Sequence, residues 1–317
     1  MQGIGCYGRA LRAGPGSRVG RRSRHCARRG GVSFTVVFLH AHPDDEALYT
    51  GGTMARLAAE GHRVVLVTAT FGEAGLTATD AANPGLGELR LQELSAAASA
   101  LGCARLIPLG YRDSGMNGSA AGAFSKLDPR EPAARVAAIL EEERADAIVT
   151  YDGNGGYGHP DHRQVHKVGS IAATMAGTGL EFQATLDRDA LRRAVKVASW
   201  AGLAPREFRA QPFDCLYTAR KDITHRVNVG SYLSQKRAAM KAHRSQATGG
   251  ETERTLALLL SFPAPFFRLA AGREWFVETG RKPGRRRLDD LLVSLRQAPI
   301  SLRQARADRI TVQPDAP

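Results

Sequence analysis

Short, mainly apolar runs alternate with amphipathic segments in the first half of the chain. Four runs have the length of strands, at residues 34–39, 63–70, 106–109 and 146–151. Such continuous apolar runs are typical of parallel strands that are buried on both faces. Helices are expected between and after them, at residues 50–60, 88–101, 132–144 and 160–174, where apolar side chains recur at helical spacing. Strands and helices that alternate in this way predict a mostly parallel α/β sheet.

The pattern is less regular after residue 175. We expect helices at residues 187–203 and 231–243 and edge strands at residues 215–218 and 224–229. No run reaches the 18 apolar residues that would suggest a membrane-spanning helix.

Polar residues gather directly after two of the predicted strands. Residues 42–46 read His-Pro-Asp-Asp-Glu, and residues 159–162 read His-Pro-Asp-His. Pro43 lacks an N–H and cannot continue a central strand, so the chain must turn there. Sites in open α/β sheets form at the carboxyl ends of the strands. We therefore expect both clusters to lie at one rim of the sheet.

Two imidazoles and one carboxylate from these clusters suit a divalent metal ion. His42, Asp45 and His162 would leave one position open, as in hydrolytic zinc sites with three protein ligands. A single histidine here would more often be a surface or turn residue, but two clusters at two strand ends favour a site. A non-haem Fe(II) oxygenase uses the same donor types and stays a remote alternative, although its usual scaffold is rich in β-structure.

Three neighbours of these residues are candidates for proton transfer and charge stabilisation. The side chains of the adjacent residues Asp44 and Asp45 point in different directions, so Asp44 is free to act as general base. The alternative is that Asp44 only supports or caps the turn. His159 could stabilise an oxyanion or protonate a leaving amine. Asp161 could orient an imidazole by accepting its second N–H, or it could cap the following helix.

Positive charge is concentrated at the N-terminus. Of the formal net charge of +13, residues 1–32 supply eight arginines and no acidic residue, which leaves +5 (13 − 8) for the rest. A tract of this kind is usually disordered, so a nucleic-acid partner is not expected. We expect three parts: an arginine- and glycine-rich tract at 1–32, a single domain at 33–279, and a basic, weakly ordered tail at 280–317.

The N-terminal tract and the four cysteines bear on where the protein acts. Residues 1–32 lack the apolar core of a secretory signal, although an organellar transit peptide or an upstream translation start remain alternatives. No Cys-x-x-Cys motif is present, which argues against a disulfide framework or a thiolate metal site. We expect a cytoplasmic protein without a membrane span, and we leave its homo-oligomeric state open.

Several motifs together resemble those of the LmbE/PIG-L family of zinc-dependent N-deacetylases. They are residues 42–46, Gly72 with Glu73, residues 113–116 (Asp-Ser-Gly-Met), residues 155–162 (Gly-Gly-Tyr-Gly-His-Pro-Asp-His), and residues 236–246, which are similar to the family's late motif. The resemblance covers residues 34–250. Within the family, the chain is most similar to the branch that holds the mycothiol-pathway deacetylase and the mycothiol conjugate amidase.

The resemblance implies a Rossmann-like fold with helices on both faces of the sheet and a metal site at the C-terminal ends of the strands. It implies Zn²⁺, with Fe²⁺ as the alternative, held by the three ligands named above, with Asp44 as general base and His159 as stabiliser of the tetrahedral intermediate. Tyr157 matches a mobile tyrosine that contacts the substrate or the oxyanion. The family's contacts to sugar and inositol hydroxyls fall on Glu73, Arg90 and Asp113.

The activity implied by the resemblance is hydrolysis of a linear, non-peptide amide by metal-bound water. The expected substrate is the acetamide of an N-acetylglucosamine-like amino sugar or glycoconjugate. Residues 77–87 and 117–131 have their own sequence and would border the pocket, so the exact substrate does not carry over. An amidase that acts on a larger thiol conjugate or a specialised metabolite is the main alternative.

Overall fold

The structure is a computed structural model that describes residues 32–73, 85–118, 120–202, 213–247 and 255–297. These residues contain one sheet with the strand order β3-β2-β1-β4-β5-β7-β6. The strands are β1 (Thr35–His40), β2 (Arg63–Thr70), β3 (Arg105–Tyr111), β4 (Ala147–Tyr151), β5 (Leu180–Thr185), β6 (His225–Asn228) and β7 (Arg273–Glu278). β1 to β5 are parallel, whereas β7 runs antiparallel to both of its neighbours. The predicted mostly parallel α/β sheet is confirmed.

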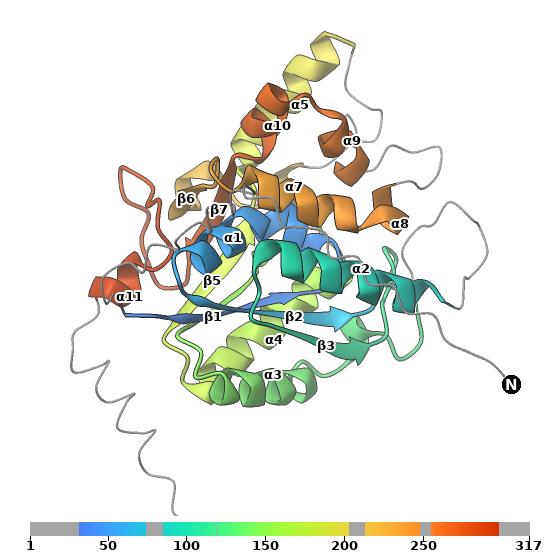
Figure 1. The fold of residues 1–317 in the computed structure, drawn as a ribbon, viewed down its shortest axis with the longest axis vertical. Coiled ribbons are helices and arrows are strands. Elements are labelled where there is room, and N and C mark those ends of the chain that lie inside the picture. The colour runs from blue at the N-terminus through green and yellow to red at the C-terminus, as the bar shows by residue number, and fades with distance from the viewer. Residues whose placement is uncertain (1–31, 74–84, 119, 203–212, 248–254, 298–317) are drawn as a thin grey trace, which may run out of the picture. The chain divides into compact units, whose positions relative to one another are not determined.

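Helices cover both faces of this sheet (Figure 1). α1 (Gly51–Ala59), α2 (Leu86–Leu101) and α7 (Leu233–Ala242) pack together on one face, and α3 (Arg130–Glu142) and α4 (Pro160–Ala176) pack together on the other. The central strand β1 is buried from Val36 onward because both of its faces are covered. None of the helices in the described ranges is long and apolar enough to cross a membrane.

The remaining helices are short or peripheral. A single π-helical turn, η1 (Glu46–Thr50), leads directly into α1, and α8 (Arg244–Ala247) follows α7 after one residue. The others are the 3₁₀ turns η2 (Phe124–Lys126), η3 (Phe213–Cys215) and η4 (Arg220–Asp222), and the α-helices α5 (Arg188–Trp200), α9 (Thr255–Ser261), α10 (Ala264–Ala271) and α11 (Val293–Gln297).

Helix α4 lies unusually close to β4, and this closeness fixes where its first turn sits. His159 is the N-cap residue and Pro160 occupies the first helical position, where its missing N–H costs nothing. A Cβ atom on Gly169 would lie only 2.2 Å from Cγ2 of Thr150, so only glycine permits this approach. The start of α4 is thereby held beside the end of β4.

The second half of the chain departs from expectation in several places. Residues 180–185 form a strand that was not predicted, and residues 215–218 form only the end of η3 and an isolated bridge from Thr218 to Asp187. Residues 280–297 differ from the expected tail, because Leu291, Leu292 and Leu295 are buried and hold this segment against the domain. The arginine tract at 1–31 and residues 298–317 lie outside the described residues.

His225 on β6 makes the stability of the fold depend on pH. Burial, reinforced by the positive charge of Arg281, lowers the pKa of His225 from 6.5 to about 4. Between those values the unfolded chain binds more protons than the native state, so stability is full above pH 6.5 and is lost as the pH falls toward 4. The loss between pH 7.5 and pH 4.5 amounts to about 2–3 kcal/mol.

Urea unfolding at pH 7.5 and pH 4.5 measures this effect. In His225→Leu, the free energy of unfolding should drop about 2–3 kcal/mol less between these two pH values than in the wild type. This variant keeps an apolar contact with Phe182. An equal drop in the variant and the wild type would contradict the assignment.

Candidate metal centre

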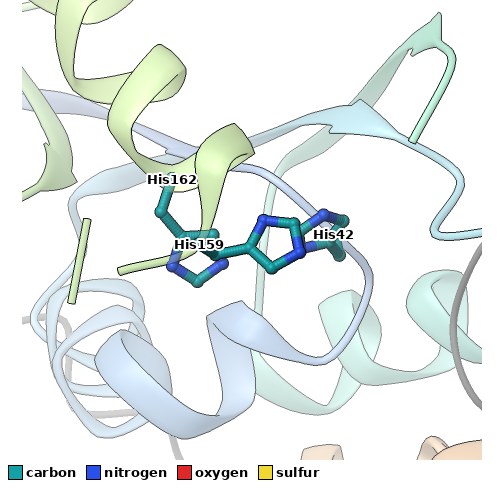
Figure 2. Close-up of side chains that lie close together, drawn as sticks. All are labelled: His42, His159 and His162. Atoms are coloured by element: carbon teal, nitrogen blue, oxygen red, sulfur yellow. The ribbon is translucent and has the colours of Figure 1, made fainter. Parts of the chain in front are cut away.

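Three histidine side chains converge at the carboxyl ends of β1 and β4. His42 comes from the turn after β1, whereas His159 and His162 come from the first turn of α4 (Figure 2). The ring of His159 lies 4.6 Å from that of His42 and 5.2 Å from that of His162, centroid to centroid. β1 and β4 are adjacent parallel strands, so the two polar clusters that follow them meet at one rim.

Asp45 lies between two of these rings. Its Oδ2 atom is 3.2 Å from Nδ1 of His42 and 3.2 Å from Nε2 of His162. Two donors bound to one tetrahedral Zn²⁺ at its usual bond lengths would be separated by about 3.3 Å. All three side chains are buried, and within the described chain Nδ1 of His162 has no hydrogen-bond partner. The donor set therefore fits a divalent metal ion.

Two further groupings overlap this one. His42, His159 and His162 bring one donor atom each within 4.8 Å of one another, and so do His42, Asp113, His159 and Asp161. Asp161, however, already accepts hydrogen bonds from the backbone N–H and the hydroxyl of Ser114. Its Oδ2 atom also lies 3.2 Å from Nε2 of His42, the ring nitrogen that faces away from Asp45. This arrangement suits a carboxylate that orients the His42 ring.

The charges at this cluster balance one another. Burial alone would raise the pKa of Asp45, but His162 and His42 together hold that pKa well below its usual range. Burial likewise opposes protonation of His42, yet Asp113, Asp161 and Asp45 raise its pKa well above the usual value. Buried carboxylates and imidazoles that stabilise each other's charged forms are typical of metal and catalytic sites.

Asp44 adopts a backbone conformation that is rare for any residue other than glycine, with φ at +107°. Such a conformation typically costs about 1–3 kcal/mol and is often found at functional sites. Its side chain is 21% exposed, and Oδ2 lies 3.5 Å from Nη2 of Arg90. Burial raises the pKa of Asp44 to about 6, although the Arg90 guanidinium opposes the shift. A carboxylate with this pKa is ionised at neutral pH and is well matched to accept a proton.

His159 is held in one tautomer by its own helix. Its Nδ1 atom accepts a hydrogen bond of 3.1 Å from the backbone N–H of Asp161, so this nitrogen carries no proton. Burial, together with electrostatic repulsion from the neighbouring His42 and His162 rings, lowers the pKa of His159 to about 4. The ring is therefore neutral at pH 7, and its proton resides on Nε2.

Tyr157 lies on a glycine-rich loop beside the histidines. Its ring is 5.0 Å from that of His162 and 5.9 Å from that of His159, and the residue is 37% exposed. Asp152 at the end of β4 accepts hydrogen bonds from the backbone N–H groups of Asn154 and Gly156, which shapes the loop. The phenol therefore stands at the border between the buried cluster and solvent.

The three residues expected to contact substrate hydroxyls occupy different environments. Glu73 is exposed and accepts a hydrogen bond from the backbone N–H of Asp113, whose own carboxylate lies 3.5 Å from Nε2 of His42. Arg90 is buried instead, and its guanidinium donates to the carbonyl oxygens of Gly72 and Pro43, at 2.5 Å in each case. Glu73 and Asp113 border the site, whereas Arg90 lies behind Asp44.

Buried polar contacts that were not predicted from the sequence support this site. His243 bonds to Glu46, Lys236 pairs with Glu274, and His40 lies between Thr50 and Tyr151. The late motif at residues 236–246 was the available signal, because it contains both Lys236 and His243.

Comparison with known proteins finds similar sequences. The PIG-L family model, described as GlcNAc-PI de-N-acetylase, matches residues 37–173. The chain is 38% identical over 257 residues to the 1D-myo-inositol 2-acetamido-2-deoxy-alpha-D-glucopyranoside deacetylase of Saccharomonospora viridis, covering 75% of this chain and 95% of the relative. The deacetylase of the same name from Rhodococcus opacus is 35% identical over 284 residues, or 77% of this chain and 97% of the relative.

The fold also matches a solved structure. A conserved protein from Thermus thermophilus superposes with a TM-score of 0.51 at 22% identity, covering 77% of this chain and 94% of that one.

Proposed function

Because the chain belongs to the PIG-L family of de-N-acetylases, we propose that it hydrolyses the acetamide of an N-acetylglucosamine-type glycoconjugate. The observation that carries the proposal is the convergence of His42, Asp45 and His162, with Asp44 next to Asp45 in the chain. Relatives that this chain covers almost completely are named for a glucosaminide of inositol. A polyol glycoside of N-acetylglucosamine is therefore the first substrate to test.

We assign the metal to His42, Asp45 and His162, with Zn²⁺ preferred because imidazole and carboxylate donors in a three-residue set suit hydrolytic zinc. When bound there, the ion would supply Lewis-acid chemistry that polarises the amide carbonyl and acidifies water. The carboxylate of Asp161 contacts Nε2 of His42 and so fixes the ring with Nδ1 facing Asp45. An imidazole oriented in this way needs no rearrangement to bind.

Asp44 is proposed as the general base. Its carboxylate accepts a proton from the attacking water, and the same proton is then available to the amine nitrogen as the C–N bond breaks. With a pKa of about 6, the Asp44 carboxylate is ionised at neutral pH and can accept a proton. Because this pKa lies close to the working pH, the protonated group can also give the proton back. The products are acetate and the free amino sugar.

His159 is proposed to stabilise the oxyanion of the tetrahedral intermediate. The neutral ring holds its proton on Nε2, because Nδ1 accepts from the backbone of Asp161. That N–H can donate to an oxygen on which negative charge develops. Tyr157 would contact the substrate at the rim, while Glu73 and Asp113 would accept hydrogen bonds from sugar or polyol hydroxyls.

The test is release of a primary amine from a panel of acetamides. The panel contains N-acetylglucosamine, its inositol and aryl glycosides, and acetylated thiol conjugates, each assayed with apo protein and with added Zn²⁺ or Fe²⁺. We expect metal-dependent release that is fastest with the inositol glycoside. Release from the thiol conjugates alone would favour the amidase. No release from any member, in protein that holds one metal ion per chain, would contradict the proposal.

A further inference from the structure

Buried contacts hold the backbone of Asp44 in its rare conformation. With φ at +107°, a half-turn of the peptide plane between Pro43 and Asp44 would return φ to about −70°, in the common region. This rotation changes ψ of Pro43 and leaves unchanged the φ that its ring fixes, so the proline ring itself does not prevent it. Contacts to this peptide group must therefore oppose its relaxation.

Two side chains of opposite charge face the two ends of this peptide group. Nη2 of Arg90 donates to the carbonyl oxygen of Pro43 at 2.5 Å, and Oε2 of Glu46 accepts from the N–H of Asp44 at 3.0 Å. Turning the plane would direct the carbonyl at the carboxylate and the N–H at the guanidinium. Both contacts would then be repulsive, in a buried setting where such interactions are strong.

Glu46 is in turn held by His243, a residue 197 positions later in the chain. The Oε1 atom of Glu46 lies 2.6 Å from Nε2 of His243, and both side chains are fully buried. The other ring nitrogen of His243 has no hydrogen-bond partner within the part of the chain that the structure describes. The polar contact of this ring is therefore directed at Glu46.

Helix α2 sets the frame for both contacts. Arg90 and Glu93 lie one turn apart on this helix and face the same side. The carboxylate of Glu93 accepts from the backbone N–H of Ser245 at 2.8 Å and from its hydroxyl at 2.7 Å. Through Arg90, the helix thus holds Pro43. Through Glu93, it holds the turn in which His243 lies.

We propose that His243 is a positioning residue for the reaction, which fixes through Glu46 the peptide plane that directs the Asp44 carboxylate. The inference rests on the proposed function, in which Asp44 accepts the proton of the attacking water. His243 touches no reacting atom. Its loss should slow the chemical step rather than weaken substrate or metal binding.

Kinetics of His243→Leu test the proposal. We expect kcat to fall about 10- to 100-fold, with KM and the number of metal ions per chain changed less than about threefold. His243→Gln should recover most of kcat, because its terminal amide can place an N–H near the position of Nε2. His225→Leu is the matched control, since it makes the same substitution at an equally buried histidine outside the site. Its kcat should stay within about threefold of the wild type.

Hydrogen exchange gives a readout that does not depend on turnover. The N–H of Asp44 is protected by Glu46, so a peptide that covers residues 40–48 should exchange faster in His243→Leu than in the wild type. The same peptide should exchange at the wild-type rate in His225→Leu. If the wild type releases no amine from any acetamide, the proposed function fails and this measurement alone decides the role of His243.

Several results would overturn the proposal. They are an unchanged kcat in folded, metal-loaded His243→Leu, an equal loss in His225→Leu, or unchanged exchange at Asp44. Should His243→Leu not fold, His243→Asn and His243→Gln replace it. These two side chains carry the same amide group but differ in length, and the asparagine side chain is too short to contact Glu46. Equal kcat values for these two variants would exclude positioning through the Glu46 contact.

Discussion

Replacement of Asp44 by asparagine should remove most turnover while the metal stays bound. The amide cannot accept a proton, and removal of a general base typically costs about 10²- to 10⁴-fold in rate. Asparagine is among the side chains that best tolerate positive φ, so the turn should persist. The measurements are kcat with the best substrate of the panel and metal content by elemental analysis.

The stability of Asp44→Asn separates a catalytic effect from a structural one. Since the carboxylate of Asp44 borders solvent at 21% exposure, its loss should change the unfolding temperature little. A variant with near-wild-type turnover would exclude Asp44 as the general base. A variant that lost the metal as well would show instead that Asp44 supports the binding site.

Replacement of His162 by alanine should abolish metal binding. Changes to the partners of metal ligands already weaken affinity about 10- to 100-fold, so loss of a ligand should weaken it more than about 100-fold. The ring of His162 also stacks on that of Tyr151, with centroids 4.0 Å apart, so the variant should lose about 1–3 kcal/mol of stability. Metal titration and thermal unfolding of the apo protein measure the two effects separately.

His166→Ala is the control for this variant. His166 lies one turn further along α4, and its Nδ1 atom contacts the carbonyl of Tyr151 rather than the cluster. This variant should bind metal as the wild type does. Equal loss of metal from both variants would point to disruption of the helix and would remove the support for His162 as a ligand.

The parallel part of the fold could be predicted because each of its signals is local. The run at residues 34–39 is almost entirely apolar, Pro43 marks the turn, and the histidines of residues 159–162 follow a second apolar run. Adjacency of β1 and β4 then brings the two clusters together. β5 escaped prediction because Glu181 and Gln183 alternate with its apolar residues, leaving one polar face on a strand of six residues.

Contacts between distant parts of the chain could not be predicted from local pattern. Nothing near Glu46 in sequence indicates that His243 will bond to it, and a buried histidine in helix-like sequence resembles an ordinary surface residue. Arg90 illustrates the same limit. The family resemblance places it among substrate contacts, which stays a prediction, but nothing near it in the sequence indicates that its guanidinium donates to the carbonyls of Gly72 and Pro43.

The position of β7 has a consequence for synthesis on the ribosome. This strand joins β6 to the rest of the sheet, and its Glu274 accepts hydrogen bonds from the N–H groups of Gly52 and Thr53 at the start of α1. A nascent chain that ends before residue 273 leaves the edge of β5 uncovered and the N–H groups of Gly52 and Thr53 without Glu274. The domain can therefore close only late in translation. For the same reason, a fragment limited to residues 37–173 should not fold on its own.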